Sequence, residues 1–153
     1  MSFLHANAMT GGYGSGADIL HECSLTVQKG EIAVIVGPNG AGKSTAMKAV
    51  FGMLNLREGS VNFDGEDITH LSPQERVHKG MGFVPQTHNI FPTMTVRENL
   101  EMGAFIRDDD ITETIDLVYE LFPAVYEKRN QNAGELSGGQ RQQVAVGSAL
   151  MTQ

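Results

Sequence analysis

A glycine-rich loop in the first third of this 153-residue chain has the composition of a phosphate-binding loop. Gly37 and Gly42 can take backbone angles that other residues avoid, so successive amides can point toward an oxyanion without Cβ atoms in the way. Lys43 adds a point charge, the Ser44 hydroxyl is placed to bind magnesium, and the helix beginning here aims its N-terminal amides at the phosphates. The predicted phosphate loop consists of Gly37, Pro38, Asn39, Gly40, Ala41, Gly42, Lys43, Ser44 and Thr45. The alternative is a glycine-rich turn with a chance lysine.

A second run, Leu136-Ser137-Gly138-Gly139-Gln140, predicts a helix start that can also face an anion. We call it the signature run. Ser137 is a natural N-cap and Gln140 stands at the third helical position, which is the spacing of a capping box. Gly138 and Gly139 leave the first amides uncovered, and bare helix-start amides attract an anion such as a γ-phosphate. The alternative is an ordinary capped helix after a flexible turn.

Hydrophobic patterning predicts the elements that would position the two runs. Residues 31–36 are apolar and β-branched, which favours a buried parallel strand just before the phosphate loop. A helix is expected from Lys43 through Leu54, and Asp64-Gly65 predicts a hairpin between residues 60–63 and 66–68. The first half therefore predicts a parallel core with an antiparallel flank.

Helices dominate the rest of the pattern. Ser72-Pro73-Gln74-Glu75 and Thr95-Val96-Arg97-Glu98 are capping boxes that open helices, and a further helix over Ile115 to Phe122 ends at Pro123. We expect an α/β domain made of a nucleotide-binding core over residues 1–86, a helical subdomain over 87–133, and the signature run with its helix over 134–153.

The charge and composition of the chain limit the kinds of partner that it is expected to bind. The chain has 11 basic and 18 acidic residues and a net charge of −7, which argues against nucleic acid as the main partner because phosphate backbones are bound by lysine and arginine. The single cysteine, Cys23, fits a reducing compartment. The N-terminus lacks a basic signal-peptide start, and no segment has the eighteen or so apolar residues of a spanning helix. A membrane role is therefore expected only through a partner.

With both runs present, the chain resembles the ABC ATPases, and the likeness extends from Tyr13 to Met151. The resemblance implies that the glutamine ending the short strand Met81 to Gln86 contacts magnesium and the attacking water, and that Tyr13 stacks on adenine. The alternatives are a solvated loop glutamine and an exposed tyrosine in a mobile loop.

The resemblance also implies ATP and Mg²⁺ as cofactors, with Lys43 and Gln86 in catalytic roles and Ser44 and Gln86 at the metal. It implies that one subunit's signature run acts on the nucleotide of a second ATPase subunit. Residues 91–100 and 136–143 look like those of branched-chain amino acid importers. That likeness implies permease subunits, an indirect substrate-binding protein, and a place at the cytoplasmic face of the plasma membrane.

The chain departs from the family pattern after the signature helix. It has no Asp-Glu pair, and every histidine precedes Leu136, so the general base, the second magnesium carboxylate and the switch histidine of the family are not in this sequence. We expect an N-terminal part of a longer protein, truncated before the strand that carries Asp-Glu. Loss of that strand's burial, roughly 8 to 15 kcal/mol, predicts that the chain alone is loosely packed and aggregation-prone.

Three rival interpretations remain. The first is a soluble ABC ATPase of DNA repair or translation, although the short helical stretch between the two runs lacks sustained heptads. The second is another phosphate-loop enzyme, a kinase or a GTPase, although no guanine-reading Asn-Lys-x-Asp is present. The third is an inactive fragment.

Overall fold

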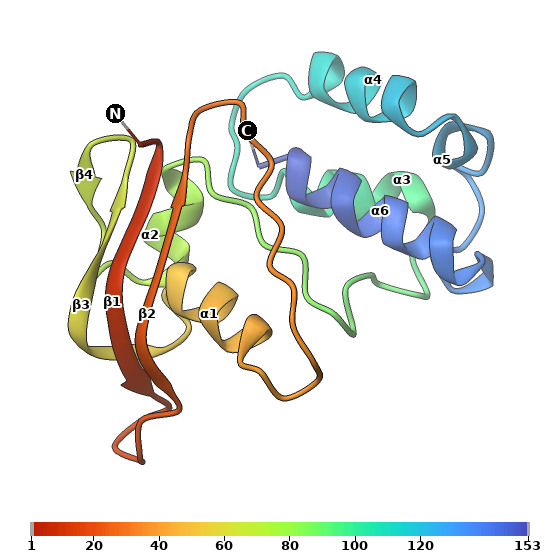
Figure 1. The fold of residues 1–153 in the computed structure, drawn as a ribbon. Helices are drawn as coiled ribbons and strands as arrows, with labels where there is room; N and C mark the ends of the chain where they lie inside the picture. Colours follow the sequence, from red (N-terminus) through yellow and green to blue (C-terminus); the bar gives the residue numbers. More distant parts are fainter. Residues whose placement is uncertain (1, 153) are drawn as a thin grey trace. The chain divides into compact units, whose positions relative to one another are not determined.

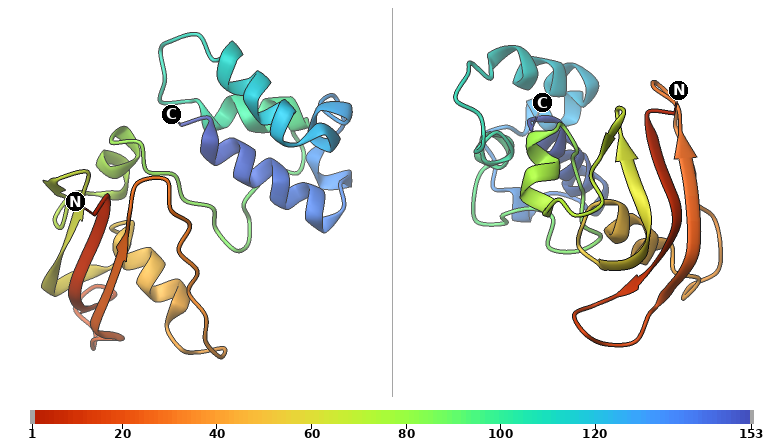
Figure 2. Two further views of the ribbon diagram at one scale, coloured as in Figure 1. Left: turned by 45° about the horizontal axis from the view of Figure 1, so that its top comes forward. Right: turned by 90° about the vertical axis from the view of Figure 1, so that its left-hand side faces the viewer.

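The computed structural model describes residues 2–152, which form two compact units that divide between Arg76 and Val77. The first unit is built on a four-stranded sheet of order β2-β1-β3-β4, antiparallel throughout (Figure 1). Its strands are β1 (Leu4–Gly12), β2 (Leu20–Val27), β3 (Asn55–Phe63) and β4 (Glu66–Asp67). Helix α1 (Lys43–Val50) packs on one face of this sheet (Figure 2). The fully buried core side chains include Ala6, Met9, Val61 and Ile68.

The predicted hairpin at Asp64-Gly65 is confirmed. Asn62 pairs with Asp67 and Phe63 pairs with Glu66. Asp64 and Gly65 both have positive φ, 48° and 86°, as a two-residue turn that follows the twist of its strands requires.

A buried arginine ties α1 to the segment that follows this hairpin. Arg76 lies in α2 (Pro73–His78) and is 1% exposed. Its guanidinium donates to the carbonyls of Val50 at 2.5 Å, Thr69 at 2.9 Å and Leu71 at 3.0 Å. Burial lowers the pKa of Arg76. The C-terminal end of α1 is thus fixed by a charged side chain that no sequence motif marks.

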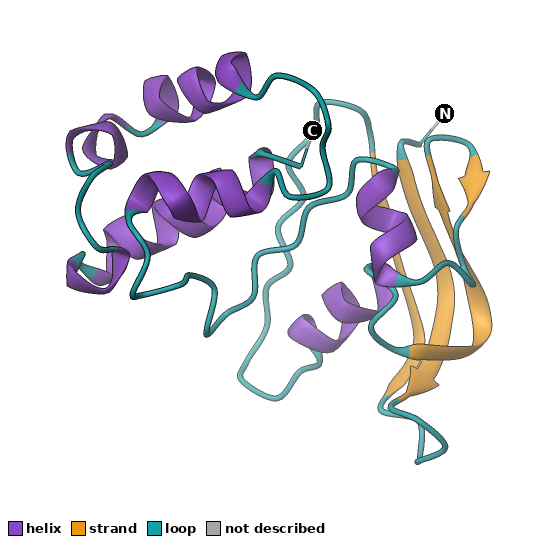
Figure 3. Cartoon of the chain, turned by 180° about the vertical axis from the view of Figure 1, so that it is seen from behind, coloured by secondary structure: helices purple, strands orange, loops and turns teal. Residues whose placement is uncertain are grey.

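Two local predictions in this unit are wrong. Residues 31–36 form no strand and run as an extended loop between β2 and α1 (Figure 3), with Ile32 89%, Val34 76% and Val36 83% exposed. A strand exists only through a hydrogen-bonded neighbour, and no segment within residues 2–152 pairs with this run. Helix α1 ends at Val50 rather than Leu54, because the chain turns at Gly52 with φ +80°.

Two further corrections concern strands. Residues 81–86, predicted as a short strand, are irregular in the structure. Strand β1 was not predicted. It precedes Tyr13, so this tyrosine lies in the turn between β1 and β2. The sequence of β1 does not indicate a strand, because five of its nine residues are Ala, Asn or Gly, yet two neighbouring strands hydrogen-bond to it.

The second unit is a helical cluster that agrees with the predicted helices. It contains α3 (Val96–Gly103), α4 (Thr112–Leu121), α5 (Pro123–Glu127), the 3-10 helix η1 (Ala133–Glu135) and α6 (Gly138–Leu150). α6 packs closely on α3, since a Cβ on Gly103 would come within 2.1 Å of the Ser148 carbonyl oxygen. Leu100, Val118 and Val144 are fully buried in the shared core. The α/β class is therefore confirmed, with its described sheet antiparallel.

Candidate nucleotide-binding site

The phosphate loop is shaped by two left-handed glycines and by its own lysine. Gly40 and Gly42 both have φ 84°, and a Cβ on either would meet open space. Lys43 Nζ donates to the carbonyls of Gly37 and Pro38, each at 2.8 Å. The ammonium group is therefore held at the centre of the loop, where a point charge can meet phosphate oxygens.

The start of α1 carries no side chain that covers its amides. Gly42 is the N-cap, in the left-handed conformation, and makes no side-chain cap hydrogen bond. No acidic residue stands in the first turn. The first amides of a helix have no intrahelical acceptor, so here they are free for an external anion.

The signature run forms the predicted capping box at the start of α6. Gln140 N–H donates to Ser137 Oγ at 3.3 Å, and Ser137 N–H donates to Gln140 Oε1 at 3.2 Å. Gly138 and Gly139 are exposed, and Cβ atoms there would meet open space. Leu136, 4% exposed, fixes the run to the helical core.

Backbone hydrogen bonds just before the signature run hold it in place. Ala133 N–H donates to the Met94 carbonyl at 2.9 Å, and Gly134 N–H donates to the Pro92 carbonyl at 3.0 Å. Asn99, 1% exposed, closes the 91–95 segment because its Oδ1 accepts from Phe91 N–H at 2.7 Å. The Asn99 side chain was not predicted to matter, since a single asparagine in a helix gives no sequence signal.

First-turn charge separates the two candidate helix starts from the other long helices. Among the described helices of eight residues or more, α3 has Glu98 and α4 has Glu113 in the first turn, whereas α1 and α6 have no acid there. An acid at a helix start offsets the positive end of the helix dipole. Its absence at α1 and α6 leaves that end uncompensated at the two places where the sequence predicts phosphate.

A cavity of about 500 Å³ lies beside the phosphate loop in the first unit. Gly40 to Lys43 and Ala46 form one wall, and Ile35 and Val36 contribute apolar surface. Residues of β2 and the turn before it, Ile19 to His21 and Cys23, form another wall. The volume falls within the range of small-molecule sites.

Tyr13 lies in the β1–β2 turn, 51% exposed, and does not line this cavity within the described residues. Lys48 of α1 donates from Nζ to the Tyr13 hydroxyl at 3.3 Å. The same Nζ is 5.7 Å from the ring centre, so the ammonium lies at the hydroxyl end of the tyrosine. Sequence reasoning missed Lys48, because its partner is 35 residues away.

Gln86 is exposed in the irregular segment before α3 and belongs to the second unit. Nearby, Asn89 Nδ2 donates to the Pro85 carbonyl at 3.2 Å and to Gln142 Oε1 of α6 at 3.1 Å. The segment that carries Gln86 is therefore tied to the signature helix through Asn89. The phosphate loop lies in one unit, and Gln86 and the signature run lie in the other.

A protein-family model described as ABC transporter matches residues 20–153. The chain belongs to the ABC transporter family. This confirms the resemblance inferred from the phosphate loop and the signature run, and it places the chain with the ATP-binding domains of that family.

Three curated relatives are similar over most of this ABC chain. The high-affinity branched-chain amino acid transport ATP-binding protein BraG of Pseudomonas aeruginosa is 42% identical over 134 residues, 87% of this chain and 58% of BraG. The probable branched-chain amino acid transport ATP-binding protein LivF of Archaeoglobus fulgidus is 39% identical over 87% of this chain and 57% of its own length. The lipopolysaccharide export system ATP-binding protein LptB of Haemophilus influenzae is 37% identical over 98% of this chain and 63% of its own length.

A solved structure supports the same assignment. The crystal structure of a nucleotide-free ATP-binding cassette from an ABC transporter superposes with a TM-score of 0.83 at 34% identity, covering 99% of this chain and 66% of that chain. The ABC chain described here thus spans about three fifths of the length of the curated relatives it matches. Within residues 2–152, no helix has the length and apolar character to cross a membrane.

Proposed function

We propose that the complete protein is the ATP-binding subunit of an ABC importer that couples ATP binding and hydrolysis to the uptake of branched-chain amino acids or similar small solutes. The observation that supports ATP binding best is the charge pattern of the helices. The two long helices that begin at the family's motifs, α1 and α6, have no first-turn acid, whereas α3 and α4 each have one. The names of BraG and LivF support branched-chain amino acid transport, and import is part of the proposal.

In this proposal the phosphate loop binds the triphosphate of ATP. The Lys43 ammonium, held by two loop carbonyls at 2.8 Å, is in place to neutralise β- and γ-phosphate oxygens. The amides after Gly42 add hydrogen bonds and the helix dipole. Ser44 is exposed beside Lys43 and is the proposed magnesium ligand, with Thr45 supporting the inner phosphates.

Magnesium would supply charge neutralisation between the phosphates and hold them in one orientation. Its proposed protein ligands, the Ser44 hydroxyl and the Gln86 amide oxygen, are both hard oxygen donors of the kind that Mg²⁺ prefers. Gln86 is further proposed to orient the attacking water and to report on the permease.

The signature run is proposed to act on the nucleotide of a second ATPase subunit. Ser137, Gly139 and Gln140 present a rigid, uncharged helix start whose capping box is closed and whose glycine amides are exposed. Such a start can bind a γ-phosphate without rearranging. Hydrolysis in this proposal requires a dimer, with permease subunits placing the assembly at the cytoplasmic face of the membrane and a substrate-binding protein involved only indirectly. Nucleic acid is not a proposed partner.

The test is the variant Ser137→Arg in the complete subunit. Ser148→Arg is not a suitable control, because Ser148 lies in the contact between α3 and α6. Asn130→Arg, which adds an arginine at an exposed polar position outside the signature run, is the matched control. We expect Ser137→Arg to bind ATP normally and to lose turnover, because the arginine blocks the partner's nucleotide. Normal turnover in that variant would remove the role of the signature run.

The cargo is tested by uptake of labelled leucine in cells that contain the complete subunit and its neighbouring permease subunits. We expect uptake to stop when Ser137 is replaced by Arg. The likeness to LptB favours export as a second candidate. ATP turnover without leucine uptake would favour that candidate and would contradict the branched-chain assignment.

A further inference from the structure

The turn that carries Tyr13 extends beyond the paired part of β1 and β2. The pairing of these strands ends at Gly11 and Leu20, and residues 13–19 are exposed or half-buried. Within the turn, Gly16 N–H donates to the Tyr13 carbonyl at 3.1 Å. At the base of the turn, Ile19 N–H donates to the Gly11 carbonyl at 2.9 Å. Two short backbone bonds do not by themselves hold an exposed loop in a single position.

A side chain from a different strand fixes this turn. Arg57 of β3 forms an ion pair with Asp18 through Nη1. Its Nη2 donates to the Gly16 carbonyl at 2.5 Å and approaches the Gly14 carbonyl at 3.4 Å. The Asn55 side-chain amide, from the same strand, also approaches the Gly14 carbonyl at 3.4 Å. The planar guanidinium therefore joins a carboxylate and two carbonyls of one turn, a task that a lysine ammonium does poorly.

The other end of the tyrosine is tied to the helix that starts at the phosphate loop. Lys48 contacts the Tyr13 hydroxyl and stands five residues after Lys43 in α1, which is about 7.5 Å along the helix axis. The Lys48 ammonium is 5.7 Å from the ring centre, and Tyr13 is still 51% exposed. The aromatic ring is thus tied to the helix that starts at the phosphate loop while much of its surface is accessible for stacking.

We propose that Arg57 is a positioning residue for base recognition, which holds the Tyr13 turn so that the ring stacks on the adenine of a nucleotide whose phosphates occupy the phosphate loop. This inference rests on the proposed function. It adds a determinant on β3, outside both motifs, whose effect is confined to the base. Arg57 is proposed to preorganise the Tyr13 turn and not to contact the nucleotide. Removing it is therefore expected to lower the affinity for ATP by roughly 2- to 10-fold.

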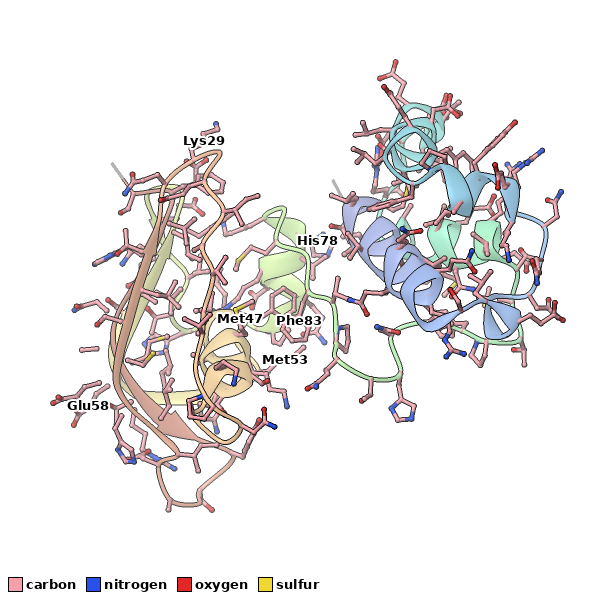
Figure 4. All side chains as sticks on the ribbon, turned by 45° about the vertical axis from the view of Figure 1, so that its right-hand side comes forward. Lys29, Met47, Met53, Glu58, His78 and Phe83 are labelled. Atoms are coloured by element: carbon pink, nitrogen blue, oxygen red, sulfur yellow. The ribbon has the colours of Figure 1, made fainter. Side chains whose placement is uncertain are left out.

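The test compares ATP with inorganic triphosphate, which lacks the base, by isothermal titration of the complete subunit with Mg²⁺ present. The variants are Arg57→Met, which keeps the apolar stem, Arg57→Lys, Asp18→Asn and Tyr13→Ala. Glu58→Gln is the matched control, because Glu58 follows Arg57 in β3 and points away from the sheet (Figure 4). Circular dichroism confirms that each variant retains its helices and strands.

We expect Arg57→Met and Asp18→Asn to weaken ATP binding and to leave triphosphate binding unchanged, with Arg57→Lys between them and the parent chain. Adding Arg57→Met to Tyr13→Ala is expected to cause no further loss, since the ring to be positioned is gone. An equal loss for triphosphate, or full ATP affinity in Arg57→Met while Tyr13→Ala binds weakly, would overturn the positioning role and leave the proposed function standing. A parent subunit that binds neither ligand would overturn both.

Discussion

The starts of α1 and α6 present bare amides to solvent by two different devices. At α1 the N-cap is a left-handed glycine with no side-chain cap, and a lysine stands at the first helical position. At α6 the N-cap is a serine whose capping box with Gln140 is closed. The first arrangement places a positive charge beside left-handed glycines, whereas the second is a capped start with no charged residue at its first three helical positions. A loop that must surround a ligand and a surface that must press on one from outside need these different properties.

Replacing Lys43 with alanine gives the largest expected effect. In the proposed function the Lys43 ammonium adds a charge-assisted hydrogen bond to the attraction that the bare amides of α1 have for phosphate. A charge-assisted hydrogen bond contributes about 1.5 to 3 kcal/mol, so affinity for ATP should fall by roughly 10- to 150-fold. Equilibrium binding measures this loss.

The control for Lys43→Ala is Lys29→Ala, which removes an exposed lysine at the end of β2 (Figure 4) and should leave affinity unchanged. Because the loss comes from the phosphates, inorganic triphosphate should be affected as strongly as ATP. Unchanged affinity in Lys43→Ala would show that the start of α1 does not bind the triphosphate. The proposed difference in role between the two helix starts would then be wrong.

Glycine-to-alanine substitutions compare the backbone conformations at the starts of α1 and α6. A Cβ at Gly42 or at Gly139 meets open space, but Gly42 has φ 84° and Gly139 lies within the first turn of α6. Gly42→Ala should destabilise the chain by about 1 to 2 kcal/mol, because L-residues are strained in the left-handed region. Gly139→Ala should stabilise it by about 0.5 to 1 kcal/mol, because alanine favours helices. Urea unfolding of both variants measures the pair, and a loss of stability in Gly139→Ala would contradict the helical geometry.

The same contrast explains what the sequence could predict. The capping boxes at Thr95 and Ser137 lie within four consecutive residues, so local spacing suffices, and both are present in the structure. The strand at residues 31–36 was predicted from composition and is wrong, because a strand depends on a neighbour that local sequence does not name.

Contacts between distant residues were missed for the same reason. Arg57 reaches Asp18 across 39 positions, and Arg76 reaches Val50 across 26. Neither arginine belongs to a motif, and their importance follows only from the pairing of β1 with β3 and from the packing of α2. The chemistry-bearing residues could be found by spacing, whereas the residues that position them could not.

Gln140→Glu tests whether neutrality matters at α6. Glutamate keeps the capping box and adds a negative charge at the helix start, which should stabilise the helix by about 0.3 to 1 kcal/mol. The same charge should repel a γ-phosphate, so turnover of the complete subunit should fall while ATP binding at the phosphate loop stays normal. Thermal unfolding and ATPase rate are measured together. A variant with full turnover would show that the absence of acid at α6 has no functional meaning.

The smallest expected effect is a pH dependence that distinguishes the cap of α3 from that of α6. Hydrogen bonds from the backbone amide and the hydroxyl of Thr95 lower the pKa of Glu98, so its contribution to stability is complete above the ordinary glutamate pKa of about 4.3. That contribution is lost as the pH falls through the lowered pKa. Gln140 does not titrate in this range. The Thr95 amide proton, which donates to Glu98 at 2.7 Å, should therefore shift in an NMR titration from pH 6 to pH 2, whereas the Ser137 amide proton, which donates to Gln140, should not shift. In Glu98→Gln the pH-dependent shift of the Thr95 amide proton should vanish, which would make the two caps alike. A Ser137 amide proton that titrates together with that of Thr95 would contradict this prediction. It would show that both helix starts undergo one acid-sensitive transition and that the neutral cap does not stabilise α6 independently.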